Sequence, residues 1–93
     1  MIRSFRHKGL RRFFENEDRR GIPTHLAPKL LNVLTFLNVA ENIGEVAPLP
    51  GLRLHQLKGE LQGYWSITIS GNWRVIFRFE RGDAHDVDFV DYH

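Results

Sequence analysis

The sequence predicts an α+β fold, with two N-terminal helices packed on one face of a small antiparallel sheet, in the order β-α-α-β-β-β-β. In the first half of the chain, apolar residues recur at helical spacing, whereas beyond residue 52 they alternate as in strands. Short turns separate the later strands, which favours a meander because parallel strands need crossovers of about a dozen residues or more. We expect the 93 residues to form one domain, residues 1–93.

The first half of the chain is expected to hold both helices. Leu10, Phe13 and Phe14 share one face of the first helix. The second helix has a longer apolar stripe and begins at Thr24, the expected N-cap. Its apolar residues cover more than one face, which is typical of a helix that also contacts another protein. The predicted elements are an edge strand over residues 2–6 and helices over residues 8–17 and 24–42.

The second half of the chain is expected to form the sheet. One face of the strands is apolar and would pack on the helices, while the other carries polar and cationic side chains suited to a nucleic acid. That polar face is expected to hold Tyr64, Ser66, Thr68, Arg74 and Arg78. The predicted strands cover residues 53–57, 64–69, 73–79 and 85–90, with hairpin turns at 70–72 and 81–83.

The composition excludes several classes of protein. The chain has no cysteine, which excludes a disulfide framework, a cysteine-ligated zinc site and thiol catalysis. No apolar run approaches the roughly 18 residues that span a bilayer, so we expect no membrane segment and a cytoplasmic protein. None of the five histidines lies at metal-ligand spacing from another, so no metal and no other cofactor is expected.

The charge distribution favours a polyanionic partner. Of the 13 cations, 10 are arginine, whose planar fork suits phosphates and whose face stacks on bases. The net charge of +2 hides a basic front and middle and an acidic end. Residues 1–20, 21–52, 53–79 and 80–93 sum to +4, −1, +3 and −4. A solvated surface of mixed charge would give the same pattern, but the arginine bias favours RNA or another polyanion.

A set of acid–base and cationic residues could cleave RNA without a metal. Such cleavage needs a base for the 2′-hydroxyl proton, an acid for the leaving 5′-oxygen, and cations for the charge on phosphorus. From spacing alone this is one function among several, because each residue could equally be an ordinary surface or partly buried side chain. The candidate residues are His55, Lys58, Arg74, Asp91, Tyr92 and His93.

Six sequence blocks resemble one family of bacterial proteins. The resemblance covers the chain from end to end and keeps the order of the blocks. They are MIRSF (1–5), KGL (8–10), LHQLKG (54–59), GYWSI (63–67), NWR (72–74) with Phe77, and VDYH (90–93). Together they resemble the HigB-type toxins of the RelE superfamily, the plasmid-maintenance killer proteins of bacterial toxin–antitoxin pairs.

The resemblance implies a ribosome-dependent endoribonuclease that cuts mRNA in the ribosomal A site and uses no metal. It implies phosphate binding by Lys58 and Arg74 and stacking on a nucleotide by Tyr92. His55, Asp91 and His93 would position the nucleophile and move protons, with base and acid left unassigned. The implied partners are the 70S ribosome, mRNA and a HigA-like helix-turn-helix antitoxin in a toxin–antitoxin hetero-oligomer. The implied RNA- and ribosome-binding residues are Arg6, Lys8, Arg11, Arg12 and Arg78.

One departure from the family pattern bears on activity. Many members carry arginine just before the Asn-Trp-Arg block, where this chain has the turn Ser70-Gly71-Asn72. A missing phosphate contact would make cutting weaker or differently specific. Two other functions remain open at this point: a non-catalytic RNA- or ribosome-binding module, and a transcriptional co-repressor that acts with its antitoxin.

Overall fold

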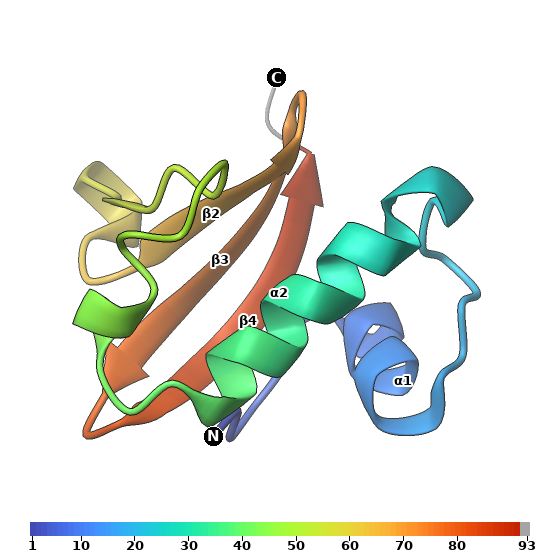
Figure 1. Ribbon diagram of the computed structural model, residues 1–93, viewed down its shortest axis with the longest axis horizontal. Helices are drawn as coiled ribbons and strands as arrows, with labels where there is room; N and C mark the ends of the chain where they lie inside the picture. The colour runs from blue at the N-terminus through green and yellow to red at the C-terminus, as the bar shows by residue number, and fades with distance from the viewer. Residues whose placement is uncertain (92–93) are drawn as a thin grey trace.

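A computed structural model describes residues 1–91 and confirms the α+β fold (Figure 1). Two α-helices precede a four-stranded antiparallel sheet whose strands follow one another in the order β1-β2-β3-β4. The helices are α1 (Lys8–Asn16) and α2 (Ala27–Val39), and the strands are β1 (His55–Gln56), β2 (Trp65–Ser70), β3 (Trp73–Glu80) and β4 (Asp83–Asp91). Short 3-10 turns lie at η1 (Thr24–Leu26), η2 (Ile43–Glu45) and η3 (Gly59–Leu61).

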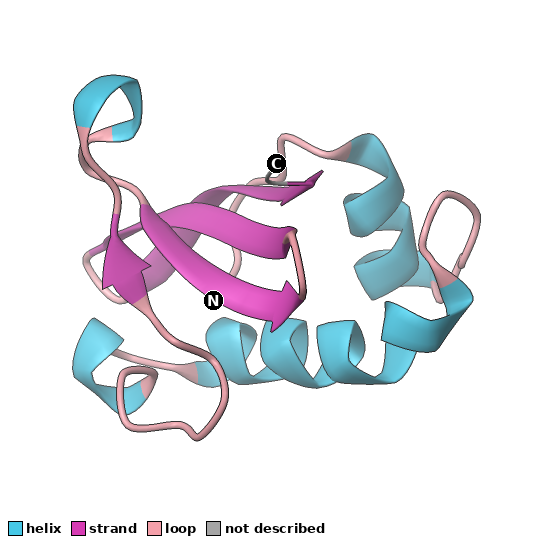
Figure 2. Cartoon of the chain, turned by 90° about the horizontal axis from the view of Figure 1, so that it is seen from above, coloured by secondary structure: helices cyan, strands magenta, loops and turns pink. Residues whose placement is uncertain are grey.

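The core lies between the helices and one face of the sheet. In Figure 2, α2 runs along one side of the strands, as its long apolar stripe predicts. Phe77 and Val75 on β3 have no exposed surface and pack with Leu34 of α2 and Leu10 of α1. Burial of one such side chain contributes about 1.5–3 kcal/mol. The sheet is therefore fixed from one side, and its other face is available for a site.

The N-terminal segment extends the sheet beside β4. Ile2 and Phe5 form isolated parallel bridges to Ala84 and Val87, where we expected an edge strand over residues 2–6. The pairing is interrupted at Asp86, which has a left-handed backbone (φ 53°) in a bulge of β4. A bulge leaves one residue out of the ladder, so the segment makes two short bridges in place of a continuous strand.

Two elements are shorter than the sequence predicts. The second helix begins with the 3-10 turn η1, and its α-helical part ends at Val39 because Ala40 turns to an extended backbone (φ −65°, ψ 133°). The strand expected over residues 53–57 is reduced to His55 and Gln56. Arg53 lies in the left-handed region (φ 48°), and this kink ends the regular ladder before residue 55.

The second face of the sheet is less polar than predicted. Ser66, expected on an exposed polar face, is 2% exposed, and its cross-strand neighbour Ile76 is 3% exposed. Leu57 is buried as well, and none of the three belongs to the main core. The chain that follows β1 therefore closes a second small apolar patch on this face, which sequence alternation alone does not reveal.

Candidate active site

A cleft of about 610 Å³ opens where the chain leaves β1 and enters η3. Its lining residues are Gln56, Leu57, Lys58, Gly59, Gln62 and Gly63. Gly59 has a left-handed backbone (φ 74°), which lets the chain turn sharply after Lys58. The buried Leu57 is part of this lining, so the cleft has an apolar floor with polar walls.

The strand register puts His55 and Arg74 on one face of the sheet. His55 pairs with Ser66, which pairs with Ile76, and directly paired residues share a face. Arg74 is two residues before Ile76 on β3, so it lies on the same face by alternation. The imidazole of His55 and the guanidinium of Arg74, both candidates from the sequence, therefore lie on the same face of the sheet.

Arg74 and His55 are both held by backbone oxygens. The Arg74 guanidinium donates to the carbonyls of Gly71 and Trp73, the latter at 3.1 Å between Nη1 and O. His55 Nδ1 lies 3.2 Å from the Arg53 carbonyl oxygen. Because neither contact is to a carboxylate, the full positive charge of Arg74 stays available to an anion.

Lys58 and Arg78 differ in whether carboxylates neutralise their charge. Lys58 is exposed on the cleft wall, and among residues 1–91 it has no ion pair. Arg78, by contrast, is held by Asp86 at 2.9 Å and by Glu80 at 2.8 Å. The hydrogen bond that Arg78 donates to Asp86 is the main reason why the pKa of Arg78 is raised. These two carboxylates more than offset the charge of Arg78, so we place the unneutralised charge at the cleft.

The C-terminal candidates are only partly described. Asp91 pairs with Trp73, and alternation puts it on the face of Phe89, opposite to that of Arg74. It is exposed at the end of β4, beside the end of the chain. Tyr92 and His93 lie outside the described residues. The structure thus puts His55 and Arg74 on one face of the sheet, two strands apart, with Lys58 on the wall of the cleft that follows β1, whereas Asp91 lies on the other face.

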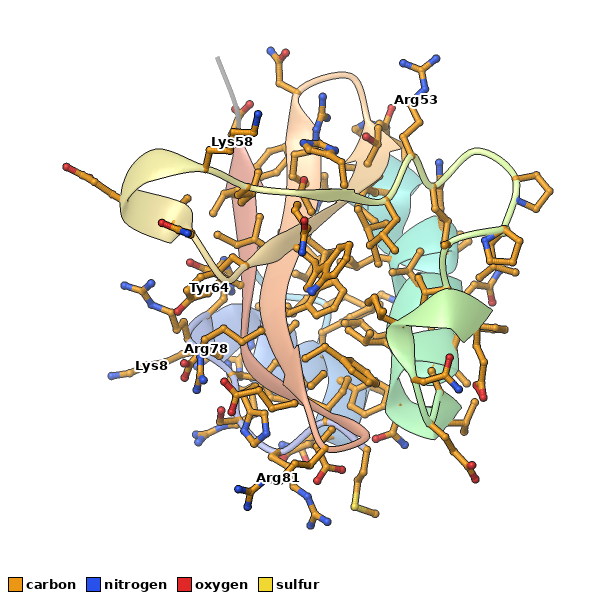
Figure 3. All side chains as sticks on the ribbon, turned by 90° about the vertical axis from the view of Figure 1, so that its left-hand side faces the viewer. Lys8, Arg53, Lys58, Tyr64, Arg78 and Arg81 are labelled. Atoms are coloured by element: carbon orange, nitrogen blue, oxygen red, sulfur yellow. The ribbon has the colours of Figure 1, made fainter. Side chains whose placement is uncertain are left out.

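The N-terminal basic residues lie on the surface of α1 and of the segment that precedes it. Arg11 and Arg12 each approach a carboxylate at 3.8 Å, Glu15 and Asp18 respectively. Such exposed pairs contribute little and exchange easily for another anion. Arg6 and Lys8 are exposed, and no ion pair involves them among residues 1–91. Figure 3 shows Lys8 on the same flank as Arg78.

Within residues 1–91, no group of three or more histidine and acidic side chains could hold a metal ion. No helix in this part of the chain is long and apolar enough to cross a membrane.

The fold is shared with a protein of known structure. A mutant of YafQ from E. coli superposes with a TM-score of 0.61 over 98% of this chain and 93% of its own, at 17% sequence identity. The shared architecture defines the class of the protein as an α+β protein built on a single antiparallel sheet.

Sequence comparison identifies the family within this class. A family profile described as "RelE-like toxin of type II toxin-antitoxin system HigB" matches residues 3–93, and the chain belongs to this family. "Endoribonuclease HigB" of Proteus vulgaris is 42% identical over the full length of both chains. "Toxin HigB-1" of Vibrio cholerae serotype O1 is 32% identical over 100% of this chain and 98% of its own. The resemblance seen in the sequence blocks is thereby confirmed.

Proposed function

We propose that this endoribonuclease toxin cuts mRNA in the ribosomal A site, without a metal ion, and so stops translation in the cytoplasm. The observation that carries the proposal is the register that gives His55 and Arg74 one face, beside the cleft edged by Lys58. The endoribonuclease name of the relative from Proteus vulgaris supports the reaction class. The resemblance to HigB-type toxins supplies the ribosomal site of action.

The proposed reaction is a transfer within the RNA backbone. The 2′-hydroxyl oxygen attacks the adjacent phosphorus and loses its proton to a base, and the bond from phosphorus to the 5′-oxygen breaks as an acid protonates that oxygen. The products are a cyclic phosphate and a 5′-hydroxyl. Lys58 and Arg74 neutralise the charge on the phosphoryl oxygens, an effect that preorganised donors supply without reorganisation.

The remaining roles fall to the imidazoles and to the end of the chain. His55, Asp91 and His93 position the nucleophile and move the protons, and Tyr92 stacks on a nucleotide. Asp91 and Arg74 lie on opposite faces of the sheet. We therefore assign Asp91 a role at the end of β4, where RNA would approach it along the edge of the sheet.

The basic surface outside the cleft would dock the toxin on ribosomal RNA. Arg6 and Lys8 are exposed cations, and the carboxylate partners of Arg11 and Arg12 are distant enough to yield to phosphates. Arg78 would contribute through shape more than charge, because Asp86 and Glu80 hold it. Phosphate contacts of this kind position a protein on RNA without reading its sequence.

A toxin of this family has a cognate antitoxin. We propose that the antitoxin is a HigA-like helix-turn-helix protein and that the two form a hetero-oligomer. The exposed apolar residues Leu31 and Val39 of α2 support a protein contact on the helical side. Neither residue lines the cleft.

The test is cleavage of mRNA in a purified translation system, mapped by toeprinting and primer extension. Wild-type protein should break mRNA at the A-site codon only when ribosomes translate it. His55→Ala should lower the rate by about 100- to 10,000-fold, the usual contribution of a positioned acid–base group. Tyr92→Ala should lower it by roughly 5- to 150-fold, because a stacking contact contributes about 1–3 kcal/mol. His25→Ala is the matched control, because His25 is an exposed histidine in η1, outside the sheet that carries His55 and Arg74.

Each contrary outcome has a distinct meaning. Cutting of free mRNA without ribosomes would disprove the A-site assignment. A block of translation with intact mRNA would favour a binding module that acts by occupancy. Operator binding with the antitoxin but no effect on translation would favour a co-repressor. Unchanged cutting by both site variants would overturn the assignment of the catalytic residues.

A further inference from the structure

Arg53, two residues before His55, has a strained backbone. Its φ of 48° lies in the left-handed region, which non-glycine residues rarely occupy. Such strain persists only where surrounding structure holds it, and it gathers at functional sites. The kink shortens β1, so the fold gives up part of a strand to keep this conformation.

The pairing of the sheet puts residues 52–53 across β2 from Arg74. The Leu52 carbonyl accepts a hydrogen bond of 2.7 Å from the amide of Thr68, and Thr68 pairs with Arg74. Neighbouring strands lie about 4.8 Å apart, so the backbone of residues 52–53 is roughly two strand spacings from that of Arg74. Two arginine side chains that start this close can contact one phosphate or two successive phosphates.

The same kink also aims a backbone group at the site. The Arg53 carbonyl oxygen lies 3.2 Å from Nδ1 of His55. Since a carbonyl can only accept, this contact requires the proton on Nδ1 and leaves Nε2 of a neutral imidazole free to accept a proton. Arg53 therefore contacts the candidate histidine through its main chain while its side chain stays exposed.

The charge around Arg53 is not neutralised. Among residues 1–91, no carboxylate pairs with Arg53 or with Lys58, and Arg74 donates to carbonyls. The segment from residue 46 to residue 59 contains no acidic residue at all. Figure 3 shows Arg53 and Lys58 toward the same end of the molecule. Arg53, Lys58 and Arg74 are thus three cations without a carboxylate partner among residues 1–91, and such a set suits consecutive phosphates of a single strand.

We infer that Arg53 is a further RNA-binding residue, which holds a backbone phosphate next to the one held by Lys58 and Arg74. The inference rests on the proposed function for its substrate, a single-stranded RNA. The side chain would act in binding rather than in proton transfer, so its loss should raise KM more than it lowers kcat.

The test measures RNA binding directly, so that it does not depend on cleavage. The probe is a fluorescent, fully 2′-O-methylated RNA oligonucleotide, which lacks the attacking hydroxyl, and anisotropy is recorded over a salt series. Arg53→Gly removes the guanidinium and suits the left-handed backbone, so the variant should be at least as stable as wild type. Arg53→Lys keeps the charge.

The matched control is Arg81→Gly. Arg81 is also an exposed arginine with a left-handed backbone (φ 53°) and no ion pair among residues 1–91, but it lies in the β3–β4 turn, at the opposite end from Arg53 (Figure 3). The two glycine variants therefore make the same change in charge and strain at two ends of the sheet.

Arg53→Gly should weaken binding roughly tenfold and reduce the slope of log K against log salt by about 0.7, the value for one phosphate contact on a single strand. Arg53→Lys should keep most of the affinity, and Arg81→Gly should bind as wild type. The inference is overturned if Arg53→Gly binds as wild type, if both glycine variants lose affinity equally, or if wild type does not bind at low salt. Cleavage that fails in the translation system while Arg53→Gly still weakens binding would refute the proposed reaction and leave this contact standing.

Discussion

The β3–β4 turn offers a sharp test of the fold through Gly82. Gly82 has a φ of 81° and follows Arg81 at 53°, so both central residues of the hairpin are left-handed, as in a type I′ turn. A Cβ added at Gly82 would lie 3.2 Å from the carbonyl oxygen of Glu41. That oxygen belongs to the backbone between α2 and η2, so it cannot swing away as a flexible side chain would.

We expect Gly82→Ala to lower the free energy of unfolding by about 2–4 kcal/mol. The left-handed conformation costs a residue with a Cβ about 1–2 kcal/mol. The forced contact with Glu41 adds about 1 kcal/mol or more, which is the lower end of the range for overpacking. Gly21→Ala is the control, because Gly21 has a matching φ of 82° and nothing within 4 Å of the added Cβ.

The assay is thermal unfolding of both variants, followed by circular dichroism. In a domain of this size, 1 kcal/mol shifts the melting temperature by roughly 4–8 °C. Gly82→Ala should therefore melt at least about 4 °C below Gly21→Ala, and both should melt below wild type. Equal losses in the two variants would refute the role of the Glu41 contact, and no loss in either would refute the backbone reasoning itself.

Three further perturbations test other parts of the structure. Phe89→Leu removes a ring stacked 4.6 Å from Trp73 and should lower the urea midpoint by the equivalent of about 1–2 kcal/mol; an unchanged midpoint would contradict this. The hydrogen bond from Arg3 holds the pKa of Asp83 below its usual 3.8, so this carboxylate stabilises the fold above that pH and the stabilisation is lost as pH falls toward the lowered pKa. Asp83→Asn should therefore flatten the acid limb of a pH series of urea midpoints, and an identical limb would disprove it. Ser4→Ala removes the 2.8 Å acceptor of the amide in the β4 bulge, which should cost about 1–3 kcal/mol and speed hydrogen exchange of that amide.

The spacing of apolar residues predicts the architecture well, because the residues at those positions are the ones that the core buries. The apolar stripe of α2 and the alternation of β3 both face one another across the core, so Leu34 and Val75 are buried as their positions indicate. The hairpin turns follow from glycine at positions that need a left-handed backbone, Gly71 and Gly82. These features are local, and local patterns carry them.

What the sequence misses depends on long-range geometry. The burial of Ser66 requires the chain after β1 to fold over it, and the pairing of Arg78 requires a bulge to turn Asp86 toward it. The residues adjacent in sequence predict neither the burial of Ser66 nor the pairing of Arg78 with Asp86. Arg53 is different, because it stands two residues before His55 in a predicted strand. Residues two apart in a strand lie on the same face, so the sequence indicates that Arg53 and His55 share a face.

The bridges between residues 2–5 and β4 also have a consequence for the order of synthesis. Main-chain bonds join Arg3 to Ala84 and Arg6 to Val87, and the Met1 amine pairs with Asp83. The first residues to leave the ribosome thus find their partners only after residues 83–87 have emerged, because contacts so distant in sequence form late. A nascent chain still inside the exit tunnel has an open sheet edge and lacks β4 against β3. The sheet therefore gains its last neighbour, and the fold is completed, only after residues 83–87 have left the exit tunnel.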